Sequence, residues 1–297
     1  MSTETASAVE LKTEQAPPAP GLLQLMAAEF TVAKHHKQRS WAWDIGAAML
    51  SVAAAFSPWP VVGLIGVALA AGAKALAKRE QSKAKASFRL AERARRYDFQ
   101  QRTLGWPSPA QEVADMMLKF SPTTRELATS KKRDLEDKYY AVGGEPSERR
   151  LFANLHESMF STEKLAGVMA ERRRGHLAVS IGAVIVVLAS ALLFPEMAPV
   201  ALLIKGLSTM LTLLVSLDVW GELKSFSRTE QEVRSLAGAV LTLFRVNHLD
   251  QNEGLRLMVD YNCLLMEMPL IPDEVRDQHQ PSINDAWAKA AESVKMT

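Results

Sequence analysis

The chain has 297 residues, 48% of them hydrophobic, and 35 basic against 33 acidic side chains leave a formal net charge of +2. Its single cysteine, Cys263, excludes an intramolecular disulfide framework and any multi-cysteine metal site, and we expect it to be a core residue. The hydrophobic residues are gathered in two blocks, 41–77 and 177–220, on either side of a strongly charged stretch. Each block is long enough for two helices that cross a hydrocarbon layer about 30 Å thick. The pattern therefore predicts an all-α integral membrane protein.

The first 40 residues precede the membrane. Residues 1–20 are polar and lack the basic start and apolar run of a secretory signal, so they predict a disordered tail. Residues 21–40 predict a juxtamembrane helix, with apolar residues near helical spacing and cations at its end. His35 and His36 point about 100° apart on such a helix, so we do not expect them to share a metal ion.

Residues 41–77 predict the first transmembrane hairpin, with the sequence SPWP as its turn. Trp41, Trp43 and Trp59 fall where aromatic rings would sit at the two membrane interfaces. Lys74 is near the cytoplasmic end and can extend to the headgroups. Four small residues share one face of the second limb, where they favour close helix packing within the chain or between copies: Gly63, Gly66, Ala70 and Ala73.

A charged cytoplasmic helical linker is expected over 78–176. Its first part, 78–102, holds a basic cluster whose arginines Arg93, Arg95 and Arg96 are candidates for lipid headgroups or for an anionic nucleotide. No glycine-rich loop follows a strand here, so no phosphate cradle is visible. We expect a break at 104–109, a helix from Ser108 or Pro109, a solvent-facing helix over 123–140 and an approach helix over 147–174 that can continue into the membrane.

The second transmembrane hairpin is predicted over 177–220. Three further candidates for lipid headgroups or an anionic ligand stand directly before it: Arg172, Arg173 and Arg174. The turn at 194–199 holds no basic residue. This asymmetry is the positive-inside pattern, which predicts that both termini are cytoplasmic. The alternative, a pair of buried helices in a soluble protein, does not explain these flanks.

Lys205 lies inside the fourth predicted span, and an ionisable residue there indicates function. Helical steps of four, three and four residues from it define one polar stripe of pore-lining candidates: Lys205, Thr209, Thr212 and Ser216. The alternative is that Lys205 extends to the outer headgroups while the hydroxyls bond to carbonyls of their own helix. The sequence leaves both readings open.

Residues 221–297 predict cytoplasmic helices: one over 227–248, one that Asp250 caps with Glu253 three residues on, and a last amphipathic piece with Trp287. Residues 78–176 hold 21 basic and 14 acidic side chains, whereas residues 218–297 hold 8 and 13. Opposite charges favour docking of these two parts. The apolar faces must supply most of its energy: Val240, Phe244, Leu257 and Tyr261.

Motifs of catalysis do not occur in the sequence. There is no HExxH, no paired-cysteine spacing, no GxSxG and no P-loop, and the six histidines are scattered. We therefore expect no enzyme, no catalytic residue, no metal site and no cofactor.

Three stretches resemble a known family: LMAAEFTVAKHHKQR before the first hairpin, YDFQQRTLGWPSP after it, and LRLMVDYNCLLMEMPLIPDEVRDQHQ near the end. The layout is similar to the four-transmembrane effectors encoded beside SMODS nucleotidyltransferases in bacterial cyclic-oligonucleotide anti-phage systems (CBASS). The aromatic-rich stretch that this family has before its third span is reduced here to Met159-Phe160.

The resemblance implies a pore-forming effector of the bacterial inner membrane that acts in antiviral defence by abortive infection. It implies a homo-oligomer in the lipid bilayer and a cyclic oligonucleotide or a sensor protein as the activating partner, with no role for a nucleic acid duplex. The alternative function is a non-conducting membrane scaffold or sensor. A small transporter is disfavoured because the spans show no pair of broken helices of the kind that coupling-ion sites use.

Overall fold

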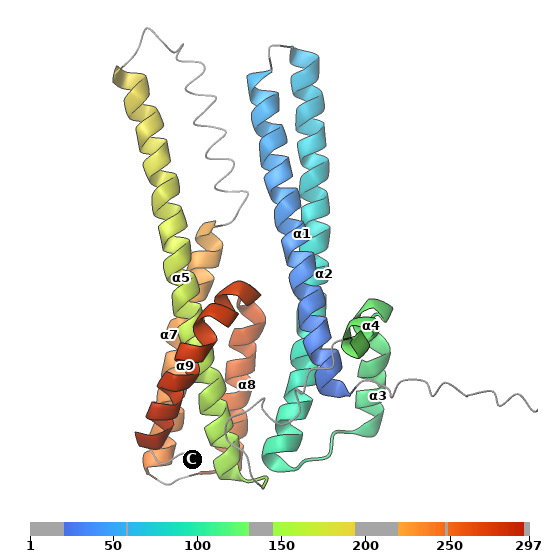
Figure 1. Cartoon of the computed structure of the whole chain (residues 1–297), viewed down its shortest axis with the longest axis vertical. Helices are drawn as coiled ribbons and strands as arrows, with labels where there is room; N and C mark the ends of the chain where they lie inside the picture. Colours follow the sequence, from blue (N-terminus) through green and yellow to red (C-terminus); the bar gives the residue numbers. More distant parts are fainter. Residues whose placement is uncertain (1–20, 58, 131–144, 194–218, 247–248, 294–297) are drawn as a thin grey trace, which may run out of the picture.

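The computed structural model describes residues 21–57, 59–130, 145–193, 219–246 and 249–293. These residues form eight α-helices and no strand (Figure 1), so the expected all-α class is confirmed for them. The helices are α1 (Leu22–Phe56), α2 (Pro60–Leu104), α3 (Ala110–Lys119), α4 (Pro122–Ser130), α5 (Glu148–Leu193), α7 (Val219–Arg245), α8 (Gln251–Glu267) and α9 (Asp273–Ser293). The predicted tail, 1–20, and the polar stripe of the fourth span lie outside the described residues.

Helices α1 and α2 form one long antiparallel hairpin (Figure 1). The predicted juxtamembrane helix and first limb are a single helix, because the cations at 34–39 do not interrupt helical geometry. Helix α2 likewise joins the second limb to the basic linker. It starts at Pro60, where a missing N–H costs nothing, and it ends at Gly105, whose φ of +67° favours glycine.

Small side chains line the contact between α1 and α2 at seven-residue spacing. Buried residues at this spacing are Ala70, Ala77, Ala84 and Ala91 on α2 and Ala33, Ser40 and Ala47 on α1. Near the turn the two backbones approach closely, since a Cβ built on Gly66 would lie 2.7 Å from the Cβ of Ala54. The small-residue face predicted for the second limb therefore packs within the hairpin.

Helices α3 and α4 pack on the end of the hairpin that lies away from its turn. Their apolar residues share a core with α1 and α2: Leu23, Leu25, Met26, Ala28, Ala91, Ala94, Met116, Phe120 and Ala128. Helix α3 starts at Ala110, one or two residues later than expected. Helix α4 covers the described part of the solvent-facing helix expected over 123–140, and six of its nine residues are exposed. One face nevertheless packs on the hairpin, since Thr124 is buried and donates a hydrogen bond to Glu29 at 2.6 Å. Residues 131–144 lie outside the described part.

Helix α5 is continuous over 46 residues, as expected for an approach helix that runs on into the third limb. Helices α7, α8 and α9 surround its first half (Figure 1). Their cores include all four apolar residues expected to mediate docking: Val240, Phe244, Leu257 and Tyr261. Helix α7 begins at Val219 rather than at Ser227.

Two local predictions for α8 and α9 are confirmed, and one for α8 is wrong. The side chain of Asp250 accepts a hydrogen bond from the backbone N–H of Glu253 at 3.3 Å, which is the predicted N-cap. Trp287 is buried in α9 and donates from Nε1 to Nδ1 of His156 at 3.3 Å. Cys263 is exposed and is not a core residue, because helical geometry places it opposite the buried face formed by Leu257, Tyr261 and Leu265.

Candidate functional site

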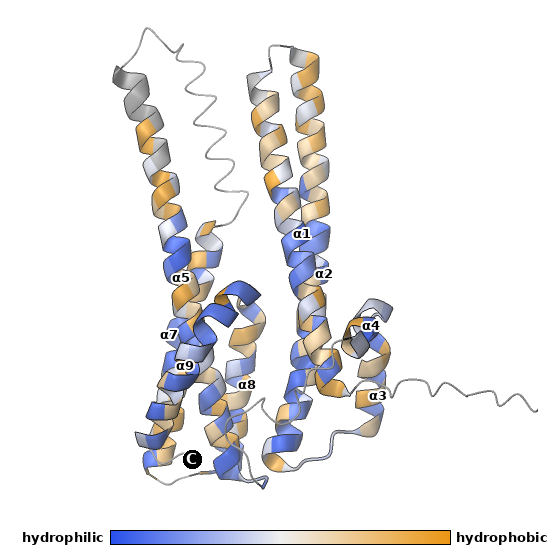
Figure 2. Ribbon diagram, in the orientation of Figure 1, coloured by the Kyte–Doolittle hydropathy of each residue, from blue (hydrophilic) through white to orange (hydrophobic). Residues whose placement is uncertain are grey.

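The apolar parts of the three long helices lie at the same end of the molecule (Figure 2). Large apolar side chains stand exposed there, Leu64 at 72% and Val179 at 74%. Others are Met49 on α1, Val61, Val62, Ile65, Val67, Leu69 and Leu76 on α2, and Ile181, Ile185 and Val186 on α5. A soluble monomer rarely exposes many large apolar side chains together, so this end is suited to a hydrocarbon environment.

Among the described residues, one helix, Val61–Leu104, is long and apolar enough to cross a membrane. Only 17% of its most apolar window is buried, and Ala70, Ala73 and Ala77 account for that share. A core helix of a soluble protein would be mostly buried. This observation supports membrane association through α2.

Aromatic and basic side chains surround the base of the apolar end, where the helices become polar. Trp41, Trp43 and Trp220 are exposed on α1 and α7, and Trp59 is exposed at the opposite tip of the hairpin. The exposed cations at this base come from four helices: Arg39, Lys78, Arg79, Arg172, Arg174 and Lys224. Aromatic rings with cations beside them are the side chains that suit the headgroup layer.

One group of ion pairs holds α1 to α2 near this base. Lys74, expected to extend to the headgroups, donates to Asp44 at 2.6 Å. Further down α2, Glu80 lies 2.7 Å from Lys83 and 2.6 Å from Nδ1 of His36. Hydrogen bonds from Lys83 and His36 lower the pKa of Glu80 to about 2, so this carboxylate stays charged across the physiological range.

A second group of ion pairs joins the hairpin to the C-terminal helices. Glu222, in the first turn of α7, lies 2.9 Å from Lys37 of α1 and 2.6 Å from Arg173 of α5. Lys34, one turn before Lys37, pairs with Asp273 at the start of α9. Burial lowers the pKa of Lys34 below its usual value, nearby Arg276 adds to this shift, and Asp273 opposes it.

The predicted anion-binding arginines are not one cluster. Arg172 and Arg174 are exposed at the base of the apolar end, whereas Arg173 is paired with Glu222. Arg93 is 16 residues beyond Ala77, which places it about 24 Å further along α2 at 1.5 Å per residue. It is exposed and lies 3.5 Å from Glu112. These two sets of arginines therefore cannot contact the same headgroup.

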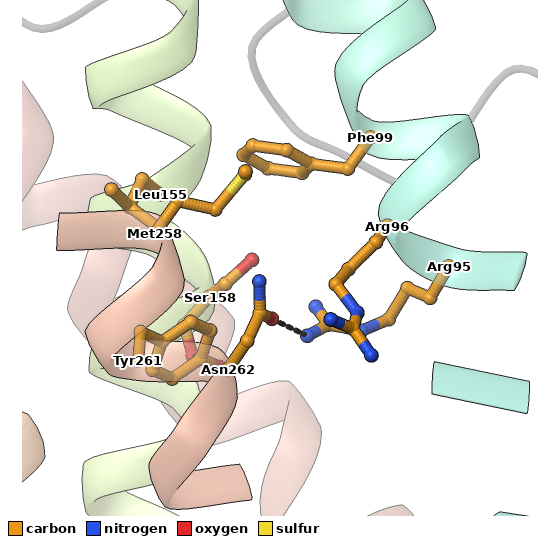
Figure 3. Close-up of a pocket in the computed structure, with 8 residues that line it drawn as sticks. All are labelled: Arg95, Arg96, Phe99, Leu155, Ser158, Met258, Tyr261 and Asn262. Atoms are coloured by element: carbon orange, nitrogen blue, oxygen red, sulfur yellow. Dashed lines mark hydrogen bonds between the residues drawn. The ribbon is translucent and has the colours of Figure 1, made fainter. Parts of the chain in front are cut away.

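Arg95 and Arg96 point into a small cavity between α2, α5 and α8 (Figure 3). Arg95 donates to Glu92 at 2.8 Å and to Asn262 at 3.4 Å, and its guanidinium lies over the ring of Tyr261. The cavity measures about 10 Å³, which is room for one water molecule. In this arrangement Arg95 joins the hairpin to α8, and the cavity leaves no space for a nucleotide.

No family model matches the chain, and no curated protein and no solved structure matches it. A shallow groove of about 230 Å³ between α7 and α8 holds Lys224 and Arg228, but Glu267 lies in it and Glu232 pairs with Arg228 at 2.7 Å. Its charges balance, so it does not select an anion.

The residues of the described part bring together no group of three or more histidine, cysteine, aspartate or glutamate side chains that could hold a metal ion. Sequence reasoning missed the ion pairs of Lys34, Lys37, Arg173, Glu222 and Asp273, which lie at the base of the predicted spans. The available signal was the position of Lys37, Arg173 and Glu222 within a few residues of a span boundary, with opposite charges on different limbs.

Proposed function

We propose that the chain is a multi-pass protein of the bacterial inner membrane, with four transmembrane helices as two hairpins, 41–77 and 177–220. The helical module, which consists of α3, α4, α7, α8, α9 and the polar parts of α1, α2 and α5, would face the cytoplasm together with both termini. The exposed apolar end, with tryptophans and cations at its base and an uncharged turn at its tip, supports this orientation. The proposal of a second hairpin is supported by the exposed apolar side chains of α5 and by the apolar sequence 198–217.

We further propose that the protein is a pore-forming or membrane-disrupting effector that the cytoplasmic module controls. The observation that carries this proposal is the continuity of α2 and α5, which run for 45 and 46 residues from the module to the apolar end. Because a continuous helix is stiff, a movement of its cytoplasmic half also moves its apolar half. A passive anchor has no need of such a connection.

The signal and the biological setting remain proposals that rest on the sequence resemblance. The effector would act in an anti-phage system by abortive infection, as a homo-oligomer, after activation by a cyclic oligonucleotide or a sensor protein. Lys205, Thr209, Thr212 and Ser216 would line the pore. A lysine at a narrow point repels cations and favours anions.

Release of a trapped dye tests this function. Purified protein is reconstituted into liposomes that contain a self-quenching dye, and Lys205→Leu and Lys205→Glu variants with equal membrane content are compared with it. We expect release by the wild type, slower release by Lys205→Leu, and a shift toward cations for Lys205→Glu in ion-selectivity measurements. Equal behaviour of all three proteins would remove the fourth span from the pore, and intact liposomes under every condition would refute a pore.

One observation favours the second candidate, a non-conducting membrane scaffold or sensor. In the described part of the first hairpin, the small residues are used in the contact between α1 and α2, and the outward residues of α2 are apolar. Asp44 and Lys74 neutralise each other. This hairpin therefore supplies no polar stripe for a lumen, and a stable, membrane-inserted protein without dye release would establish the scaffold.

A further inference from the structure

The described helices form two bodies, each with its own core. The first body is α1 to α4, with the core around Met26, Met116 and Phe120. The second body is α5 and α7 to α9, with two cores, around Leu155 and Val240 and around Met169 and Phe226. Phe99 of α2 takes part in the first of these two cores, and every other buried residue of the three cores comes from the body that it is assigned to. The two bodies can therefore change their relative position by turning about Phe99 while each keeps the rest of its core.

The bodies touch at two levels of different chemistry. Far from the apolar end the contact is largely apolar: Phe99 of α2 is buried in the core of the second body, and the Arg95 guanidinium lies over Tyr261. The backbone N–H of Ser147 also donates to the carbonyl of Thr103 at 2.9 Å. This level fits a hinge, since packed apolar side chains tolerate a small rotation better than they tolerate separation.

At the base of the apolar end the contact is ionic. Lys34 and Lys37 are one helical turn apart on α1, and they pair with Asp273 of α9 and Glu222 of α7. Glu222 binds Arg173 with its other carboxylate oxygen, so one residue joins α1, α5 and α7. Its side chain is only 12% exposed, which strengthens charge-assisted hydrogen bonds relative to those in open water.

These pairs lie next to the predicted spans, so their opening would act directly on the position of the spans. Lys37 is four residues before Trp41, Arg173 is four before Leu177, and Glu222 is two after Trp220. They therefore stand at the bases of the first, third and fourth predicted spans. Loss of the Glu222 charge would leave Lys37 and Arg173 beside each other without compensation, which favours separation of the two hairpins.

We propose that the pairs Lys34–Asp273 and Lys37–Glu222–Arg173 are an ionic latch that holds the two bodies together in the resting state, and that its opening releases the membrane activity. The regulatory role of the latch rests on the proposed function, whereas the existence of the latch does not. An exposed ion pair within one body would not have this role. Arg228 pairs with Glu232 of α7 and with Glu267 of α8, which both belong to the second body, and it serves as the control.

The latch is tested with two readouts on the full chain in lipid. In a Cys263→Ser background, spin labels replace Gln38 of α1 and Gln231 of α7, which are both uncharged and exposed, and their distance is measured. Dye release from liposomes is measured with the unlabelled variants. Helix content by circular dichroism shows that each variant is folded.

The double variant Glu222→Gln with Asp273→Asn should lengthen and broaden the label distance and raise the initial rate of dye release at least about tenfold, because a bond to a charged group is strong enough to shift a two-state equilibrium by that factor. The exchange Lys34→Asp with Asp273→Lys should restore both readouts relative to Lys34→Asp alone. Arg228→Gln should change neither.

An unchanged label distance in the double variant would overturn the latch, and so would an exchange that restores nothing. A longer distance with unchanged dye release, in a wild type that does release dye, would overturn its regulatory role. If no protein releases dye, the pore proposal fails, and the label distances still decide whether the latch exists.

Discussion

Replacement of Gly66 by alanine should force apart the two helices of the first hairpin. The new Cβ would lie 2.7 Å from the Cβ of Ala54 and 3.3 Å from its Cα. Because non-bonded carbons rest about 3.5–4.0 Å apart, α1 and α2 must separate by about 1 Å at this level. Overpacking of this kind costs about 1–3 kcal/mol, whereas replacing glycine by alanine within a helix gains up to about 1 kcal/mol.

Gly72→Ala is the matched control, because it lies on the same helix and nothing is within 4 Å of its Cβ position. It should stabilise the hairpin by up to about 1 kcal/mol. We therefore expect Gly66→Ala to be less stable than Gly72→Ala by about 1–3 kcal/mol in unfolding by SDS in mixed micelles, followed by circular dichroism. Equal stability of the two variants would refute the close approach of α1 and α2.

Three further predictions concern the helices outside the apolar end. Phe99→Ala should destabilise the chain by about 3–5 kcal/mol in chemical unfolding, because it empties a site in the core of the second body; a loss below about 1 kcal/mol would contradict the hinge contact. Asp250→Ala should cost about 1 kcal/mol and increase hydrogen exchange at the first turn of α8, while unchanged exchange would argue against the cap. Since the pKa of Glu80 is lowered from 4.5 to about 2, its pairs should contribute fully above pH 4.5 and lose their contribution as the pH falls toward 2. Thermal unfolding from pH 6 to pH 2.5 should show this loss in the wild type, and Glu80→Gln should reduce it; identical pH profiles would contradict the assignment.

Features that depend on a few neighbouring residues were predictable from the sequence. The helix end at Gly105 and the cap at Asp250 follow from backbone conformation and from one short side-chain bond. Continuity of α5 was predictable because no proline separates Arg174 from the apolar run, and the single glycine there, Gly175, costs a helix only about 1 kcal/mol. The exposure of Cys263 could also have been predicted, because the helical spacing that marks Tyr261 and Leu265 as core residues places Cys263 on the opposite side of α8.

The contacts between the two bodies were not predictable in the same way. Lys34 and Asp273 are 239 positions apart, and Lys37 and Glu222 are 185 apart. Charge counts predicted pairs of the kind seen between Arg173 and Glu222, but not the reverse pair of Glu163 with Arg234, and they did not identify α1 as a partner. A side-chain period describes which face of a helix is buried, not which helix covers it. For the same reason the arginines of α2 looked available for a ligand, although Arg95 packs against α8.

Labelling of Cys263 tests most directly whether the apolar end lies in the bilayer with the module in the cytoplasm. This native thiol is exposed on α8, so a maleimide that cannot cross membranes will report its side of the membrane. We predict that Cys263 is not labelled in intact spheroplasts and is labelled after lysis. In a Cys263→Ser background, Trp59→Cys should already be labelled in intact spheroplasts. Labelling of Cys263 in intact spheroplasts, or recovery of the protein in the soluble fraction, would contradict the account.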